Sequence, residues 1–408
     1  MDVVETADRA LVARASANDA TVLRAPTRPS SSAPGLIPVT AVPAEAWRAL
    51  SVRAIEPNGY YLPEWALAVN ATAPGRTGAS ALCAWSDPSR ASRLIGLLPV
   101  VSLRRAYKIP LPALVSGHPY GTLCTPPIDR DAAEEAAIGL IEGARRAGAR
   151  ALILREVALD GAAVQAMTDV QRREGLRPRL LQSHQRACLD ATRDADELLQ
   201  EALGAKKLKE LRRQRNRLAE HGAVSFEVAR SRREVAVALE AFLALEASGW
   251  KGQRGTALMQ NDGDLAFIRR AALALADTGQ CEIVALRAGD TPVASGIVLR
   301  HQSRAFFFKL GVDERFAKSS PGVQLTLDLT RHLCSDSTIA SADSTASPDH
   351  PMINPIWRGR FTIGDVLLPL RRHDPVVPLI HAALVARLAA LDLARRGVRA
   401  MRALRKRA

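Results

Sequence analysis

The sequence predicts an α/β (α+β) fold that arose by duplication, with two mixed, mostly antiparallel sheets flanked by helices. Two observations predict this fold. Strand-like segments followed by a loop, a helix and another strand occur between residues 80 and 157, and the same series recurs between residues 281 and 342. In both copies a helix separates the last two strands, and such a connection produces a right-handed parallel crossover.

The first copy begins with a helical pattern at residues 44–55. Short apolar runs bounded by turn residues predict strands at 80–85, 94–103 and 120–124. The loop TPPIDRD comes next, and a helix at 132–147 and a strand at 151–157 complete the copy.

The second copy has strand patterns at 281–287, 292–301 and 304–310, a basic loop at 318–322, a helical pattern at 323–332 and a strand pattern at 338–342. A helix at 235–247 precedes these strands. Between the copies, residues 194–221 form a helical pattern with leucines on one side and the basic run KKLKELRRQRNR on the others. This basic face indicates either a solvated surface or a groove for a phosphate-bearing partner or RNA.

Four segments follow from these patterns. Residues 1–43 are expected to be a flexible leader, because 27–43 are rich in Pro and Ser. Residues 44–190 form the N-terminal, degenerate copy and residues 191–372 the C-terminal, competent copy. Residues 373–408 form a basic amphipathic helical tail. A chain of 408 residues is also longer than one hydrophobic core usually serves.

Composition limits the class of protein. The chain is 47% hydrophobic and has no apolar run of the roughly 18 residues that a membrane span requires. Its start lacks an apolar signal segment, so a cytoplasmic location is expected. The net charge of +14 indicates anionic partners. The five cysteines are odd in number and widely scattered, which argues against a disulfide framework and against a zinc site.

The strongest functional signal lies between residues 305 and 330, AFFFKLGVDERFAKSSPGVQLTLDLT. A strand leads through a basic loop directly into a helix, and the free N–H groups at the start of a helix bind anions. Gly322 permits close approach and Lys318 adds a positive charge. The alternative is an ordinary connection in which Ser320 caps the helix. The corresponding loop of the first copy has two acids and no glycine, so an anion would be repelled there.

Three segments in this order resemble a known family: EASGWKGQRGT at 246–256, FFKLGVDERFAKSSPGVQL in the region 306–325, and DSTASPDHPMINPIWRGR at 343–360. They are similar to the bacterial GNAT-like acetyltransferases of the CelD type, which are associated with cellulose biosynthesis. That family is related to the Fem-type aminoacyl transferases, which carry two GNAT units. The resemblance covers roughly residues 45–372 and implies a tandem GNAT-like duplication.

The resemblance implies an acyltransferase in which an acceptor amine attacks the thioester carbonyl of acetyl-CoA or another acyl-CoA. This chain departs from the family's usual pyrophosphate-binding loop, because its loop at 318–323 has a single glycine. An aminoacyl-tRNA donor, as in the Fem relatives, therefore stays open. The residues expected to bind the acyl carrier are Leu310, Gly311, Lys318, Ser319, Ser320, Gly322, Val323 and Gln324.

A base must remove a proton from the acceptor amine. Asp343 is the first candidate because it follows a strand end, and His350 and Glu246 are the alternatives. Each also has an ordinary interpretation, as a turn aspartate, a surface histidine and a locally paired glutamate. The acceptor is expected to contact aromatic and cationic side chains, namely Trp250, Lys251, Lys309 and Trp357. No Gly-x-Ser-x-Gly, His-Glu-x-x-His, Walker or dinucleotide-binding motif occurs, so those chemistries and a metal cofactor are not expected.

The expected partners are an acyl-CoA and an amine-bearing small molecule or envelope precursor, with an exopolysaccharide setting implied by the resemblance. Nucleic acid enters only with the aminoacyl-tRNA alternative, since the basic helix has no interleaved aromatic residues. A non-catalytic accessory protein that retains the fold is the third hypothesis. The tail combines apolar helical spacing with arginines, a pattern that favours contact with an anionic membrane surface or docking on its own domain.

Overall fold

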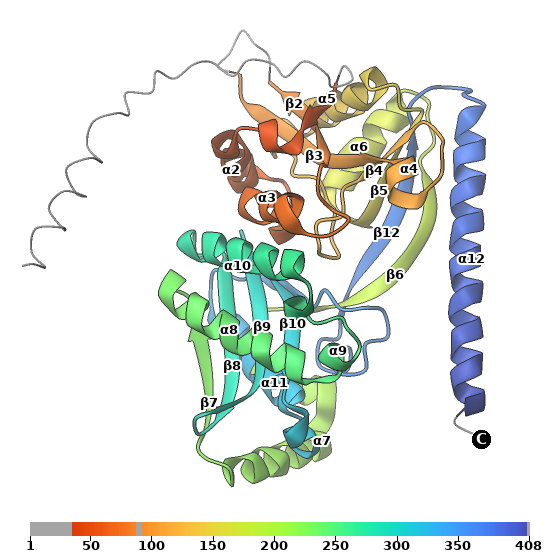
Figure 1. The fold of residues 1–408 in the computed structure, drawn as a ribbon. Coiled ribbons are helices and arrows are strands. Elements are labelled where there is room, and N and C mark those ends of the chain that lie inside the picture. Colours follow the sequence, from red (N-terminus) through yellow and green to blue (C-terminus); the bar gives the residue numbers. More distant parts are fainter. Residues whose placement is uncertain (1–34, 87–91, 406–408) are drawn as a thin grey trace, which may run out of the picture. The chain divides into compact units, whose positions relative to one another are not determined.

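The computed structural model describes residues 35–86 and 92–405, so most of the predicted leader lies outside the described residues. One mixed sheet of 12 strands runs through this part of the chain in the order β1-β2-β3-β4-β5-β12-β6-β11-β10-β9-β8-β7 (Figure 1). The predicted fold class, a mixed α/β fold with flanking helices, is confirmed. The prediction of two separate sheets needs correction, because the strands of both copies join edge to edge.

The N-terminal half contains six strands, namely β1 (Ile37–Pro38), β2 (Ser80–Trp85), β3 (Leu94–Ser102), β4 (Ala113–Ser116), β5 (Ala151–Ala158) and β6 (Arg179–Asp190). Its α-helices are α2 (Ala44–Arg53), α3 (Pro63–Thr72), α4 (Leu103–Tyr107), α5 (Ala133–Arg146) and α6 (Ala162–Arg173).

The rest of the sheet comes from the C-terminal half, namely β7 (Val224–Ala229), β8 (Cys281–Ala288), β9 (Thr291–His301), β10 (Arg304–Val312), β11 (Ser341–Asp343) and β12 (Gly359–Pro369). Its α-helices are α7 (Ala195–Ala219), α8 (Arg232–Ser248), α9 (Trp250–Gln253), α10 (Asp262–Asp277), α11 (Pro321–Ser335) and α12 (Val376–Arg405).

Strand pairing confirms the duplication. In the first half, β2 pairs antiparallel with β3, β3 antiparallel with β4, and β4 parallel with β5. In the second half, β8, β9, β10 and β11 repeat these three pairings in the same order and directions. Helix α5 forms the parallel crossover of the first half and α11 that of the second.

Two strand predictions differ from the structure. Residues 120–124 are not a strand, and the third strand of the first half is instead the shorter β4, placed between Pro112 and Gly117. The segment at 120–124 still runs beside β5, because the Cys124 amide donates a hydrogen bond to the Glu156 carbonyl at 3.0 Å. The predicted strand at 338–342 begins later, at Ser341. Short strands of this kind have too few residues for a clear alternating pattern.

Strand β12 joins the two halves. It comes from the end of the chain but lies between β5 and β6, pairing with both in antiparallel register. Strand β6 in turn pairs with β11 at its C-terminal end. Figure 1 shows β6 and β12 as long neighbouring strands between the two halves. The domain boundaries at 190 and 372 therefore stay a prediction within one continuous sheet.

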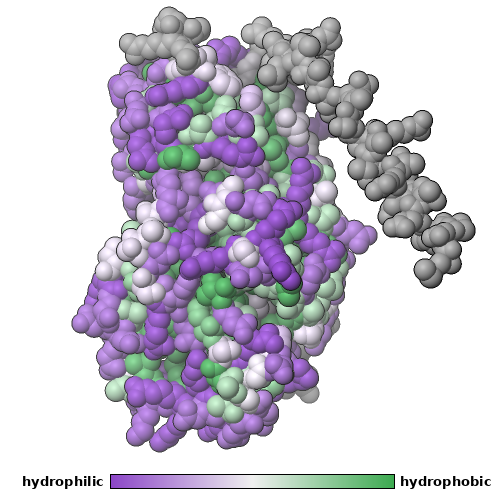
Figure 2. Space-filling model, turned by 90° about the vertical axis from the view of Figure 1, so that its left-hand side faces the viewer, coloured by the Kyte–Doolittle hydropathy of each residue, from purple (hydrophilic) through white to green (hydrophobic). Residues whose placement is uncertain are grey.

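Alternating side chains on the strands form a core on each face of the sheet. In the N-terminal half, Leu152 and Leu368 pack with α5 and α6, whereas Ile153 and Leu367 pack with α12 on the other face. In the C-terminal half, α8 and α10 cover one face and α7 and α11 the other. On the face of the molecule away from α12, hydrophobic residues appear only in small separate areas (Figure 2).

Local signals explain the helix limits near the functional site. Asp194 caps α7 by accepting a hydrogen bond from the Glu197 amide, and Ser231 and Glu234 form a capping box at the start of α8. Gly204 interrupts α7 with φ of 72°, a conformation that glycine adopts without steric cost. The basic segment of α7 therefore continues in a different direction from its first two turns.

Shortening a buried side chain of β12 should destabilise the whole molecule, because this strand completes the N-terminal core. We expect Leu368→Ala, at a fully buried position of β12, to lower the free energy of unfolding by about 2–5 kcal/mol in urea denaturation. The matched control is Leu379→Ala on α12, whose side chain is 60% exposed, with an expected change of about 0.5 kcal/mol or less. Equal effects of the two substitutions would contradict this role of β12.

Candidate active site

A cavity opens where β10 and β11 separate. The two strands pair in parallel only from Arg304 to Phe306, although β10 continues to Val312. Beyond Phe306 the chain that follows β11 turns away, and a cavity of about 310 Å³ lies in the gap. Its walls are formed by Phe307, Phe308, Lys309, Leu310 and Val312 from β10 and by Ser344, Thr345, Ala346, His350, Met352 and Ile353 from the segment after β11.

A β-bulge lies in the wall of this cavity. On the β9 side, Phe307 faces Val298 and Lys309 faces Ile297, so Phe308 has no partner residue. Such a bulge bends the strand and redirects its side chains, and bulges are frequent next to active sites. On the other side, the backbone of β10 beyond Phe306 has no partner strand among the described residues, so this edge faces the cavity.

Thr345 stands at the point where the strands separate, in a strained conformation. Its φ is 51°, which is unusual for a β-branched residue. Three hydrogen bonds hold it there: its amide donates to Asp343 Oδ1 at 2.8 Å, its hydroxyl donates to the Phe307 carbonyl at 2.6 Å, and its carbonyl accepts from the Thr122 hydroxyl at 3.3 Å. Strain that is stabilised in this way is typical of functional sites.

A buried ion pair lies directly behind Thr345. Arg186 on β6 donates from Nη2 to Asp343 Oδ2 at 2.9 Å, and the two side chains are 1% and 2% exposed. The other terminal nitrogen of Arg186 donates to the Thr122 carbonyl at 2.7 Å. Sequence reasoning missed Arg186 and Thr345, because 157 residues separate Arg186 from its partner and no local pattern links them.

The three predicted catalytic residues have different positions. Asp343 is in the buried ion pair and does not line the cavity. His350 does line it, and its Nδ1 accepts a hydrogen bond from the Ile353 amide at 3.4 Å. Glu246 on α8 is buried, with Oε2 accepting from the Leu258 amide at 3.0 Å and Oε1 accepting from Lys309 Nζ at 3.1 Å. Of the three, only His350 borders the cavity directly.

The residues expected to bind the acyl carrier divide into two groups. Leu310 lines the cavity, Lys318 is exposed, and Ser320 and Val323 are half-buried. Four others are buried, namely Gly311, Ser319, Gly322 and Gln324. The Gln324 amide donates to the Leu211 carbonyl at 2.8 Å and is thus engaged inside the protein.

Gly322 has a packing role at the cavity wall. A Cβ atom at this position would lie 3.1 Å from Val312 Cγ1 and 3.2 Å from both Leu310 Cδ2 and Met352 Sδ. Glycine therefore lets the start of α11 pack against the cavity wall, and its role in binding an anion stays a prediction. The open cleft beside β10 is present, but much of the first turn of α11 is covered.

The predicted acceptor-binding residues are also separated. Lys309 lines the cavity and its ammonium group is held by Glu246. Trp357 is a core residue that is 1% exposed, and its indole donates to the Thr330 hydroxyl at 2.9 Å. Its place in the core explains why a tryptophan occurs at this position, and no substrate contact is needed. The side chains of Trp250 and Lys251 lie outside what the structure describes.

Comparison with protein families agrees with this geometry. Residues 205–349 match the model of the acetyltransferase (GNAT) domain. This part of the chain is similar to a GNAT domain. The match includes β10, α11 and β11, so it covers the strands that form the cavity together with their crossover helix. The N-terminal half repeats the topology but lies outside the matched residues.

Solved structures share the fold over both halves. The C-terminal domain (DUF2156) of a putative lysylphosphatidylglycerol synthetase from Agrobacterium fabrum has a TM-score of 0.51 and 14% identity, covering 84% of this chain and 95% of its own. FemX has a TM-score of 0.54 and 11% identity, covering 83% and 98% respectively. At these identities the similarity concerns the fold alone. None of the curated proteins searched matches the sequence.

The GNAT-like region has no clustered metal ligands in its described part. Within residues 35–86 and 92–405, no group of three or more His, Cys, Asp or Glu side chains could hold a metal ion. The chemistry available at the cavity is that of backbone amides, Lys309, His350 and the hydroxyl groups of Ser344 and Thr345.

Removing either partner of the Arg186–Asp343 pair should be costly, because the other charge would stay buried without a partner. We expect Arg186→Met and Asp343→Leu each to lower the free energy of unfolding by about 3–5 kcal/mol, and the double variant to lose less than the sum of the two. Urea denaturation of all four proteins measures this difference.

The control for this pair is Arg193→Met, which breaks an exposed ion pair with Glu201. Because solvent screens an exposed pair of this kind, its loss should change the free energy of unfolding far less than loss of the buried pair. If the double variant lost the full sum of the single losses, Arg186 and Asp343 would not be coupled.

Proposed function

We propose that this chain is an N-acyltransferase that transfers an acetyl or other acyl group from a CoA thioester to an amine in the cavity between β10 and β11. One observation carries the proposal: the cavity lies where parallel strands separate, beside a bulge, and most of its walls belong to the residues that match the GNAT domain, whereas His350, Met352 and Ile353 directly follow them. The arrangement aligns an acyl group with an exposed strand edge. Positioning of this kind can lower the activation free energy of the transfer by roughly several kcal/mol, because the reactants are already aligned.

The apolar part of the cavity suits the acyl group. Phe307, Leu310 and Ile353 provide its apolar walls. Backbone amides of β10 that face the cavity would donate to the carbonyl oxygen as negative charge develops on it, which is the usual electrostatic contribution to acyl transfer. The carrier phosphates would then extend toward the exposed Lys318 and the half-buried Ser320 and Val323.

His350 is the proposed proton acceptor. It is the candidate base whose side chain borders the cavity. Its Nδ1 accepts a long hydrogen bond from the Ile353 amide at 3.4 Å, so this nitrogen is the basic one and would take the proton as that hydrogen bond is released. An imidazole changes protonation near neutral pH, as a base for an ammonium group must. Lys309 would repel a protonated amine and so favour the neutral nucleophile, while Glu246 limits this effect by pairing with Lys309. Asp343 is proposed to position Thr345 rather than to take the proton.

Filling the cavity should abolish donor binding. We expect Ala346→Phe to remove the thermal stabilisation that acetyl-CoA gives the wild type, because the added ring occupies the acyl space. The matched control is Ser347→Phe, since Ser347 is the exposed next residue and does not line the cavity. Differential scanning fluorimetry measures both. If Ala346→Phe kept the full acetyl-CoA shift, the acyl group would bind elsewhere.

Replacing His350 should slow transfer without preventing binding. We expect His350→Gln to lower kcat about 10²–10⁴-fold with little change in the affinity for acetyl-CoA. Release of free CoA thiol, measured with a panel of amines, gives the rate. An unchanged kcat in this variant would exclude His350 as the base.

A second candidate function is aminoacyl transfer from a charged tRNA, and two observations favour it. The first turn of α11 is largely covered, which leaves little room for a pyrophosphate. In addition, exposed cations on α7 have no ion-pair partner among the described residues, namely Lys206, Lys209, Arg212, Arg213 and Arg217. Binding of charged tRNA but not acetyl-CoA, lost in an Arg212→Glu/Arg213→Glu variant and weakened by salt, would favour this function.

The biological setting is also a proposal. The resemblance to CelD-type proteins supports exopolysaccharide or cellulose metabolism in the cytoplasm, with an envelope precursor as the acceptor. A non-catalytic accessory role in the same process is the alternative, and it predicts no binding of acyl-CoA or tRNA.

Contact with the inner membrane through α12 is proposed as well. Within the described residues, one helical segment, Val376–Ala394, is by length and composition apolar enough to cross a membrane, and 17% of it is buried. This finding corrects the sequence-based expectation that the chain has no apolar run of that length. Leu379 and Leu393 are 60% and 72% exposed on this helix. Basic residues follow, so an anionic surface is the expected target. Flotation with anionic but not neutral vesicles, lost in Leu379→Glu/Leu393→Glu, would support it.

A further inference from the structure

A second cavity lies in the N-terminal half, under α12. Its volume is about 570 Å³, and it is bounded by β5, β12 and β6 on one side and by α12 on the other. Ile153 and Leu181 from the sheet and Leu384 and Leu388 from α12 form its apolar walls. It shares no residue with the walls of the acyl cavity, so its function does not depend on the proposed transfer reaction.

A bulge in β5 directs two adjacent charged side chains into this cavity. Leu154 faces Val366 and Val157 faces Gly364, which leaves both Arg155 and Glu156 opposite Asp365. Glu156 has φ of 46°, a strained value for a residue with a side chain. In a regular strand, neighbouring side chains point to opposite faces, but here Arg155 and Glu156 both line one cavity.

Hydrogen bonds hold the polar side chains at the floor of the cavity. Asp365 Oδ1 accepts from the Glu156 amide and Oδ2 accepts from Gln182 Nε2, both at 2.7 Å. These bonds stabilise the bulge and use both oxygens of Asp365. Asp392 on α12 pairs with Arg396 at 2.6 Å and is likewise engaged.

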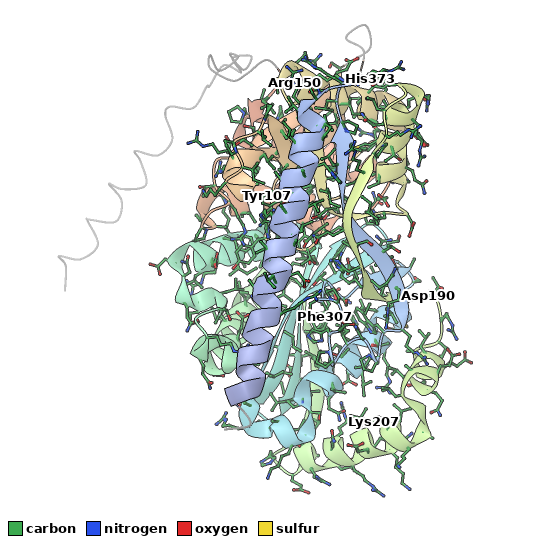
Figure 3. All side chains as sticks on the ribbon, turned by 90° about the vertical axis from the view of Figure 1, so that its right-hand side faces the viewer. Tyr107, Arg150, Asp190, Lys207, Phe307 and His373 are labelled. Atoms are coloured by element: carbon green, nitrogen blue, oxygen red, sulfur yellow. The ribbon has the colours of Figure 1, made fainter. Side chains whose placement is uncertain are left out.

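Two arginines lie near the same aromatic ring at this cavity. The guanidinium of Arg387 on α12 lies 4.1 Å from the centre of the Tyr107 ring, and that of Arg155 lies 5.9 Å from it. Figure 3 shows Tyr107 beside α12. Both arginines are half-buried, and neither has a carboxylate within ion-pair range among the residues that the structure describes.

Glu156 is the complementary charge. Its carboxylate has no hydrogen bond or ion pair with the described residues, and burial raises its pKa. Charged side chains rarely lie in such positions unless they are paired. Arg155 and Arg186 attract the Glu156 carboxylate through space, but no ion pair within 4.0 Å joins Glu156, Arg155 or Arg387 to another described residue. The cavity thus presents two cations and one anion that are not in contact ion pairs, next to an apolar wall.

We propose that this cavity is a ligand site for a small zwitterion, with a phosphate or carboxylate group held between Arg155 and Arg387 and an ammonium group held by Glu156. A guanidinium binds such anions through two parallel hydrogen bonds. The same chemistry occurs in free metabolites and in the head group of phosphatidylethanolamine. The apolar residues of α12 at the cavity would contact the carbon chain of either ligand.

Calorimetric titration of the full chain tests the site. The probes are O-phosphoethanolamine and β-alanine, which carry the two possible anions, and ethanolamine, which lacks one. We expect one of the zwitterions to bind and ethanolamine not to bind. Arg387→Gln should weaken that binding at least about tenfold, because an arginine–anion contact contributes more than 1.4 kcal/mol. Arg104→Gln, at an exposed position of α4 that does not line the cavity, is the matched control and should bind as the wild type does.

Glu156→Gln separates the ammonium contact from the anion contact. This variant should bind the zwitterion more weakly but inorganic phosphate no more weakly than the wild type. Circular dichroism melting confirms that each variant is folded. Arg155→Gln tests the second arginine in the same way as Arg387→Gln, and Arg155→Lys, which retains a charge, replaces it if it does not fold.

Vesicles distinguish the two sources of the ligand. If phosphatidylethanolamine vesicles bind in an Arg387-dependent manner while both soluble zwitterions fail, the ligand is a lipid head group. If soluble zwitterions bind, the ligand is a free metabolite. Failure of all of these probes, or equal binding by Arg387→Gln and the wild type, would overturn the proposal.

Discussion

The buried ion pair between Arg186 and Asp343 is the interaction on which the site depends. Arg186 belongs to β6 of the N-terminal half and Asp343 ends β11 of the C-terminal half. Because both side chains are removed from water, each charge requires the other. Asp343 then accepts from the Thr345 amide and helps to hold that residue at a positive φ, which turns the chain away from β10 and opens the cavity. The two halves are therefore joined structurally at the candidate site.

The continuous sheet places the two halves of the duplicated chain in different surroundings. Strand β12 fills the position between β5 and β6, and β6 reaches β11, so the last strand of the chain completes the first half. In the C-terminal half, the loop after β11 leaves a space beside β10 that a ligand can enter. In the N-terminal half, the equivalent acidic loop is structural, since Asp129 is fully buried and pairs with Arg53 at 2.9 Å.

Sequence patterns predicted the repeated order of strands and helices well, because apolar periodicity reflects which face of an element is buried. They also drew attention to His350 and Lys309, which line the cavity. They did not predict that Trp357 is a core residue or that Gly322 packs against Met352, because glycine and tryptophan suit both packing and binding. No sequence pattern predicted the bulge at Phe308, because the bulge depends on the register of β10 with β9.

The sequence by itself determined the elements, their duplication and the concentration of charge on α7 and in the tail, because these follow from the local spacing of side chains. Only the tertiary structure decided which residues meet. Arg186 and Asp343 are far apart along the chain, as are Tyr107 and Arg387, and each pair is brought together by strand order and by the packing of α12. Both cavities arise from such long-range contacts, whose partners no local pattern specifies.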